Sequence, residues 1–159
     1  MTSQKEYLTA GRTTSTESGL HKLVERVEAA SRRPIRVVIA DDEILNHDIY
    51  QAVLSGYGIS HIQFAEDGQE ALDAVDTHQP DIVFLDTNMP RMEGHEACKR
   101  LRQKYGADLR IVGMSSLSLN EKLWEGSGAD HYVNKDVLCG TSKGDNLGNY
   151  LKRILPRDF

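Results

Sequence analysis

Five polar residues of the sequence each follow a short, mainly apolar run: Asp41, Asp42, Asp86, Ser115 and Lys135. Carboxylates held close together raise one another's pKa unless a cation neutralises them. Mg2+ suits such a group because it prefers oxygen ligands and is held by one or two carboxylates together with phosphate oxygens. A lysine ammonium group and a serine hydroxyl would supply further contacts to a phosphate. The five residues therefore predict a Mg2+ and phosphate site, provided that the fold brings them together.

The pattern of the chain indicates how the fold could do so. Five runs rich in β-branched or aromatic residues predict strands at residues 36–40, 61–65, 81–85, 110–114 and 131–134. Amphipathic helices are predicted between them, and this alternation is typical of a parallel sheet covered on both faces. We predict an α/β fold, a (βα)5 flavodoxin-like, doubly wound parallel five-stranded sheet with an N-terminal helical extension. Ligands of such sheets bind at the carboxyl ends of the strands, where the polar residues stand.

The apolar positions of each helix indicate the face that packs on the sheet. In the first predicted helix they are Leu45, Ile49, Ala52 and Val53. The next two helices have the stripes Ala71, Leu72 and Val75, and Gly94, Ala97, Cys98 and Leu101. The fourth helix, at about residues 120–125, is short and weakly patterned. The fifth is defined by Leu147, Tyr150, Leu151 and Ile154.

The length of 159 residues indicates one domain with a small appendage. Residues 1–19 are rich in Ser, Thr, Gly and charge without any period, and they predict a disordered tail. Residues 20–34 predict an amphipathic helix and linker, with the stripe Leu20, Leu23, Val24 and Val27. The remaining residues, 35–159, are predicted to form the domain.

Charge and hydropathy exclude several classes of partner. The net charge is −5, and residues 35–159 carry 20 Asp and Glu against 13 Lys and Arg, which suits nucleic acid poorly. No apolar run approaches the roughly 18 residues of a membrane helix, and the N-terminus lacks the apolar core of a secretory signal. We expect a cytoplasmic protein with neither nucleic-acid nor membrane partners.

Four motifs in order resemble the receiver domain of two-component response regulators, of the single-domain, CheY-like type. They are VVIADD at 37–42, FLDTNMPRMEG at 84–94, MSS at 114–116 and YVNK at 132–135. The second fits the pattern D-x-x-M-P-x-M-x-G of that family. The resemblance covers residues 35–155 and implies a phosphoprotein that serves signal transduction in a phosphorelay, without being an enzyme beyond its own phosphoryl transfer and dephosphorylation.

The resemblance also implies a role for each site residue. Asp86 would be the phosphoacceptor, and Lys135 would pair with the phosphoryl oxygens. Mg2+ would be bound directly by Asp42, Asp86 and the main-chain carbonyl of Asn88, and mostly through water by Asp41. Ser115 would be the switch hydroxyl that moves toward the phosphoryl group, and Tyr132 would rotate inward with it.

The partners implied by the resemblance are a histidine kinase or histidine phosphotransferase and a downstream protein. The surface that reports phosphorylation in the family lies around the fourth helix, the fifth strand and the fifth helix. A homodimer through the N-terminal helix or the fourth-helix face is a further alternative. The sequence names neither the kinase nor the output partner.

Some positions depart from the family, and other classes compete with it. Asp136 follows Lys135 where the family usually has a proline in a cis peptide bond, so we expect no cis bond there.

The competing interpretation is a Mg2+-dependent phosphatase of haloacid dehalogenase type, which also uses an aspartyl nucleophile. That class needs a second aspartate two residues on, and Asn88 occupies that position. A flavodoxin would need a phosphate loop where the acidic residues Asp41 and Asp42 stand.

Overall fold

The computed structural model describes residues 22, 24–25, 34–117, 120–139 and 151. They form a sheet with the strands β1 (Arg36–Ala40), β2 (His61–Ala65), β3 (Ile82–Asp86), β4 (Arg110–Ser115) and β5 (His131–Asn134). All paired strands are parallel, in the order β2-β1-β3-β4-β5. The five predicted strands are confirmed, and their ends differ from the prediction by no more than one residue.

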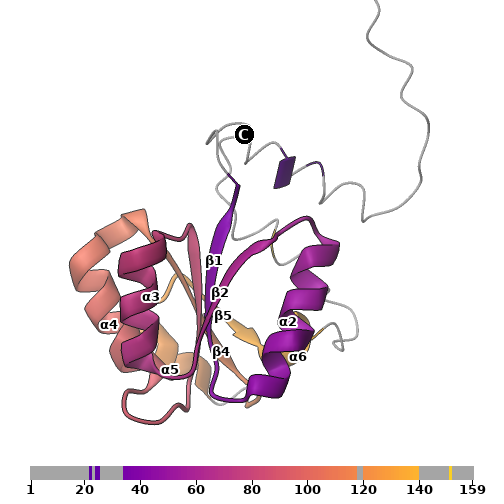
Figure 1. Ribbon diagram of the computed structural model, residues 1–159. Coiled ribbons are helices and arrows are strands. Elements are labelled where there is room, and N and C mark those ends of the chain that lie inside the picture. Colours follow the sequence, from indigo (N-terminus) through magenta and orange to yellow (C-terminus); the bar gives the residue numbers. More distant parts are fainter. Residues whose placement is uncertain (1–21, 23, 26–33, 118–119, 140–150, 152–159) are drawn as a thin grey trace, which may run out of the picture.

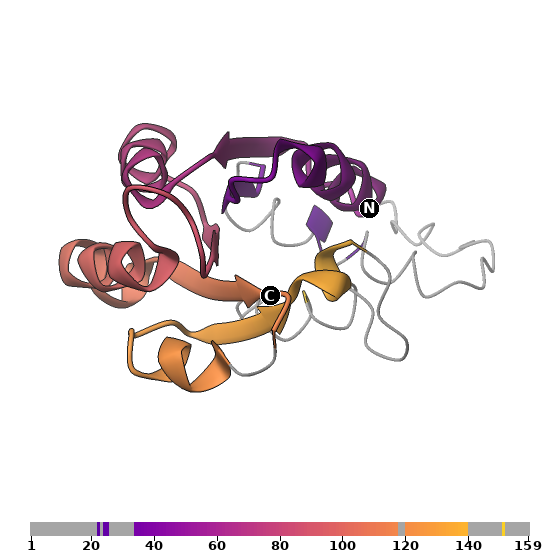
Figure 2. The same cartoon turned by 90° about the horizontal axis from the view of Figure 1, so that it is seen from below.

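Helices cover both faces of the sheet and complete three layers. On one face lie α3 (Gly68–His78), α4 (Gly94–Tyr105) and α5 (Glu121–Glu125), and on the other lie α2 (Ile44–Gly56) and α6 (Lys135–Leu138) (Figure 1). Figure 2 shows the same separation from below. The predicted flavodoxin-like, doubly wound fold is therefore confirmed.

Apolar side chains form one core cluster on each face of the sheet. β3 is buried along its whole length, which explains why its sequence is apolar on both faces. The predicted inner faces of two helices are confirmed: Ala71 and Val75 of α3 are buried, as are Gly94, Ala97, Cys98 and Leu101 of α4. Leu72 is only partly buried.

The predicted inner face of α2 is wrong except for Val53, which is partly buried and packs against the core. Leu45 is 82% exposed and Ile49 is 42% exposed, whereas the buried residues are Tyr50 and Leu54. The helix is thus turned by about one residue relative to the prediction. The physical reason is the Tyr50 side chain, whose ring fills the core while its hydroxyl donates a hydrogen bond to a carboxylate at the end of β1.

Only part of the two predicted terminal helices is described. Lys22, Val24 and Glu25 are helical, and Val24 is buried in the same core cluster as Tyr50. Leu151, from the predicted fifth helix, is also helical and buried. The tail at 1–19 and the other residues of these two helices lie outside the described residues, so the domain boundaries remain predictions.

The Lys135–Asp136 peptide bond is trans, like every other peptide bond between described residues. Over the same residues, no helix combines the length and apolar character that are needed to cross a bilayer.

Candidate functional site

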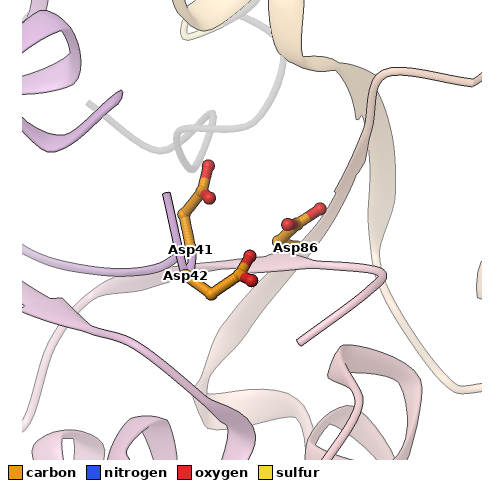
Figure 3. A group of neighbouring side chains, drawn as sticks. All are labelled: Asp41, Asp42 and Asp86. Carbon is orange, nitrogen blue, oxygen red and sulfur yellow. The ribbon is translucent and has the colours of Figure 1, made fainter. Parts of the chain in front are cut away.

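Three carboxylates meet at the carboxyl ends of β1 and β3. Asp41 and Asp42 follow β1, Asp86 ends β3, and one carboxylate oxygen from each lies within 4.8 Å of the others (Figure 3). β1 and β3 are paired in parallel, with Ala40 opposite Leu85, so their ends lie side by side. The chain leaves these two strands in opposite directions, toward β2 and toward β4, which makes this the switch point of the sheet.

Lys135 supplies a positive charge to this group. Its Nζ lies 2.9 Å from Oδ2 of Asp86 and 3.0 Å from Oδ2 of Asp41. The lysine is the first residue of α6, directly after β5, and it is 9% exposed. Burial lowers its pKa, but the hydrogen bond and charge of Asp86, together with Asp41, outweigh burial and raise the pKa above its ordinary value. The ammonium group is therefore charged at neutral pH.

The two buried carboxylates differ in acidity. Burial is the largest influence on Asp86 and raises its pKa to about 6, although Lys135 acts in the opposite direction. Burial also raises the pKa of Asp41, but hydrogen bonds from Tyr50 and from the main chain of Glu43 outweigh it and leave the pKa below its ordinary value. A cation at the site would favour the ionised form of Asp86, which is the nucleophilic form.

Asp41 is fully buried and surrounded by donors that are not predicted from the sequence. The Tyr50 hydroxyl donates to Oδ2 at 2.7 Å, the Asn46 amide donates to Oδ2 at 3.2 Å, and the Glu43 amide donates to Oδ1 at 2.9 Å. The one available signal is a tyrosine at an inner helical position, because a buried phenol usually needs a hydrogen-bond partner. With its oxygens so engaged, Asp41 is better suited to contact a metal through water than directly.

The donor set fits Mg2+. Oxygens around one octahedral Mg2+ lie about 3 to 4 Å apart, since each Mg–O distance is about 2.1 Å. The limit of 4.8 Å among the three carboxylates is close to this spacing, and Asp42 is exposed and open to solvent. Within the described residues no histidine or cysteine belongs to the group, so nothing there favours zinc. Asn88, whose carbonyl is the fourth predicted ligand, is exposed in the loop after β3.

The loop after Asp86 is held close to β3 by a glycine. A Cβ atom at Gly94 would overlap the main-chain oxygen of Asp86, so only glycine allows α4 to begin this close to the site. The amide of Gly94 also donates to the main-chain oxygen of Thr87 at 3.2 Å.

Trp124 is a further residue near the site that is not predicted from the sequence. Its indole N–H donates to the Thr87 hydroxyl at 3.0 Å, and that hydroxyl donates to the main-chain oxygen of Met114 at 2.7 Å. The ring lies against Gly113, where a Cβ atom would overlap it. These contacts join α5 to the residue that follows Asp86, across 37 positions of sequence.

Ser115 and Tyr132 lie at the ends of the neighbouring strands. Ser115 ends β4 and is 3% exposed, and its Oγ accepts hydrogen bonds from the Leu117 amide at 3.0 Å and the Asn120 side chain at 2.8 Å. The Tyr132 hydroxyl donates to the main-chain oxygen of Leu117 at 2.7 Å. Both residues thus lie at the predicted edge of the sheet, where they are hydrogen-bonded to Leu117, and Ser115 also to Asn120.

Comparison with known proteins gives matches to response regulators. The family model described as the response regulator receiver domain matches residues 37–140. Response regulator MprA of Mycolicibacterium vanbaalenii is 38% identical over 104 residues, which are 64% of this chain and 44% of the relative. The chain therefore spans less than half the length of the curated relatives it matches.

Solved structures give the same result. The receiver domain of the Francisella response regulator 1452 is 28% identical, with a TM-score of 0.57, over 64% of this chain and 84% of that one. The CheX-CheY-BeF3-Mg2+ complex from Borrelia burgdorferi contains a chain that is 25% identical, with a TM-score of 0.61, over 77% of this chain and 87% of that one. With the parallel sheet and the acidic switch point, these matches identify the family: the chain belongs to the response regulator receiver domains of two-component signalling.

Proposed function

We propose that this receiver domain accepts a phosphoryl group on Asp86 from the phosphohistidine of a histidine kinase or histidine phosphotransferase, and that it signals through contacts with another protein. The observation that carries this proposal is the position of Asp86 between an acidic group and the ammonium of Lys135. Phosphoryl transfer requires mainly positioning and neutralisation of charge, and these residues provide both.

The chemistry follows from the residues at the strand ends. An oxygen of ionised Asp86 attacks the phosphorus atom, the new P–O bond forms as the P–N bond breaks, and the imidazole of the donor leaves. Asp42, Asp86 and the Asn88 carbonyl would hold Mg2+, with Asp41 acting through water; the ion would neutralise charge on the transferring phosphoryl group. Lys135 would turn from Asp41 and the Asp86 carboxylate to the phosphoryl oxygens.

The product places new charge beside Ser115. A phosphoryl group adds roughly −1.5 to −2 charges at neutral pH and offers strong acceptor oxygens. Ser115 would donate its hydroxyl proton to one of them, and Tyr132 would move with Leu117, to which its hydroxyl is hydrogen-bonded. The surface around α5 and β5 would then differ between the two states, and a downstream protein would read the difference.

We further propose that the phosphohistidine donor docks on the first turns of α2. This helix begins two residues after Asp42, and it exposes Ile44 by 60%, Leu45 by 82% and Ile49 by 42%. Apolar side chains grouped beside a reactive residue are typical of a protein contact. A cytoplasmic location is part of this proposal, because phosphohistidine donors are made from ATP.

The alternative of a haloacid-dehalogenase-like phosphatase is not supported. Asn88 stands where that class has its second aspartate and is exposed in the loop after β3. A carboxamide cannot serve as the general acid that this mechanism requires.

Labelling with acetyl phosphate and Mg2+ tests the proposal. The protein should gain one phosphoryl group, seen by intact mass and removed by hydroxylamine, as expected of an acyl phosphate. Asp86→Asn should abolish the labelling, whereas the matched variant Asp48→Asn, at an exposed position of α2, should leave it unchanged. Labelling that survives Asp86→Asn would refute the assignment.

A further inference from the structure

The hydroxyl of Ser115, the proposed switch residue, is hydrogen-bonded to the side chain of Asn120. The Oγ atom of Ser115 accepts hydrogen bonds from the side-chain amide of Asn120 at 2.8 Å and from the Leu117 main-chain amide at 3.0 Å. A hydroxyl oxygen has two lone pairs, and these two donors occupy both. The Ser115 oxygen is therefore held by Leu117 and Asn120, two residues that lie between β4 and α5.

Asn120 occupies a position where an asparagine side chain ordinarily caps the start of a helix. It is the N-cap residue of α5, and asparagine is favoured at N-caps because its side-chain oxygen accepts a hydrogen bond from a main-chain amide of the first turn. No such capping hydrogen bond is formed here. The side chain of Asn120 instead turns back to Ser115, five residues earlier in the chain.

Leu117 is also hydrogen-bonded to Tyr132. The main-chain oxygen of Leu117 accepts hydrogen bonds from the Tyr132 hydroxyl at 2.7 Å and from the main-chain amide of Asn120 at 3.3 Å. Ser115, Leu117, Asn120 and Tyr132 thus form one hydrogen-bonded group, which we call the latch. A displacement of Ser115 toward Asp86 would have to break the bond to Asn120.

We propose that Asn120 is a positioning residue that holds Ser115 in its resting place, and that its release accompanies phosphorylation of Asp86. This inference rests on the function proposed above. Asn120 is also the residue immediately before α5. Loss of its hydrogen bond to Ser115 would therefore allow the start of α5 to move, and this helix bears the exposed side chain of Leu123. The latch would therefore oppose activation and would link the switch hydroxyl to the α5 surface.

Beryllofluoride with Mg2+ tests the latch, because it binds an aspartate carboxylate in the manner of a phosphoryl group. The dissociation constant is measured from the fluorescence of Trp124, the single tryptophan of the chain. Asn120→Ala should tighten beryllofluoride binding, since one neutral hydrogen bond of the resting state is worth roughly two- to tenfold in an equilibrium. Lys122→Ala, at an exposed position of the same helix, is the control and should change nothing.

Two further variants separate positioning from a structural effect. Asn120→Ser keeps a good N-cap residue but is too short to reach Ser115, so it should behave like Asn120→Ala. In a Ser115→Ala background, Asn120→Ala should have no effect, because the hydroxyl that it holds is gone. If Asn120→Ala lowers the stability of the protein in urea, the beryllofluoride affinity of Asn120→Ser is compared with that of the unsubstituted protein instead.

The outcomes distinguish the inference from the function on which it rests. If the unsubstituted protein does not bind beryllofluoride, or if Asp86→Asn binds it equally well, the proposed function fails and the latch fails with it. If binding depends on Asp86 and Ser115 while Asn120→Ala and Asn120→Ser bind like the unsubstituted protein, only the latch is wrong. An equal effect of Asn120→Ala with and without Ser115 would likewise overturn it.

Discussion

The indole nitrogen of Trp124 donates a hydrogen bond to the hydroxyl oxygen of Thr87 at 3.0 Å, with both side chains buried. This bond connects α5, on one face of the sheet, to the residue that follows the proposed phosphoacceptor. The position of α5 is therefore coupled to the loop after β3, and we expect the fluorescence emission of Trp124, the single tryptophan, to respond to changes in that loop.

Replacing Thr87 by valine should destabilise the protein by about 1 to 3 kcal/mol, because the buried indole N–H then has no acceptor. Urea denaturation measures this loss. Thr77→Val is the matched control. Thr77 is exposed, and the hydrogen bond described for its hydroxyl is to a main-chain oxygen of its own helix, so this substitution should lower the free energy of unfolding by less. A cost for Thr87→Val that persists undiminished in a Trp124→Phe background would show that the indole contact is not its cause.

Asp86→Asn should stabilise the metal-free protein at neutral pH. The pKa of Asp86 is about 6 in the folded protein and near 3.8 ordinarily, so the folded state binds the proton more tightly. The contribution of this carboxyl to the free energy of unfolding is therefore present at low pH and is lost as the pH rises from about 4 to 6, by about 3 kcal/mol. Urea titrations in EDTA at pH 4 and pH 7 should show the two proteins alike at low pH and the variant more stable at pH 7. A constant difference at both pH values would contradict this origin.

Mg2+ should stabilise the protein through the acidic group at the switch point. At a concentration ten times its dissociation constant, an ion that binds only the folded state adds about 1.4 kcal/mol. Thermal denaturation with Mg2+ and with EDTA measures the increment. Asp42→Asn should remove most of it and Asp48→Asn should retain it; an equal increment in both variants would place the ion elsewhere.

Tyr50→Phe should destabilise the protein by about 1 to 3 kcal/mol, because buried Asp41 loses its shortest hydrogen bond. The same substitution should raise the pKa of Asp41, since the Tyr50 hydroxyl is the strongest influence that lowers it. Tyr57→Phe, at the end of the same helix and only partly buried, is the control. Equal costs for both substitutions in urea denaturation would mean that the carboxylate is not the relevant partner.

Surface substitutions on α2 should separate transfer between proteins from labelling by a small molecule. Leu45→Ser should slow phosphorylation by a phosphohistidine donor several-fold, while leaving labelling by acetyl phosphate unchanged, because a small donor needs no docking surface. Leu123→Ser, on the exposed side of α5, is the matched control. Equal loss of both reactions in Leu45→Ser would point to a disturbed site.

The strands and the carboxylates could be predicted because each depends on local sequence. A buried parallel strand must be apolar on both faces, and the site residues of such sheets follow the strands, so Asp41 and Asp86 were both identifiable. The buried face of α2 could not be predicted. Apolar periodicity does not show that the Tyr50 hydroxyl donates a hydrogen bond to a buried carboxylate nine residues earlier, which places Tyr50 on the inner face. The bond between Trp124 and Thr87 depends on packing across 37 residues, and no local pattern encodes it.

The contact between Lys135 and Asp86 spans 49 positions of the chain, and the lysine is the last of the site residues to be synthesised. While the polypeptide is being made, Asp86 emerges from the ribosome well before the ammonium group that offsets its charge. A nascent chain that ends before β5 thus carries the acidic residues without their counter-charge. If Asp86 accepts a phosphoryl group as proposed, the site would become competent only once β5 has joined the sheet, and signalling would then depend on the completion of folding.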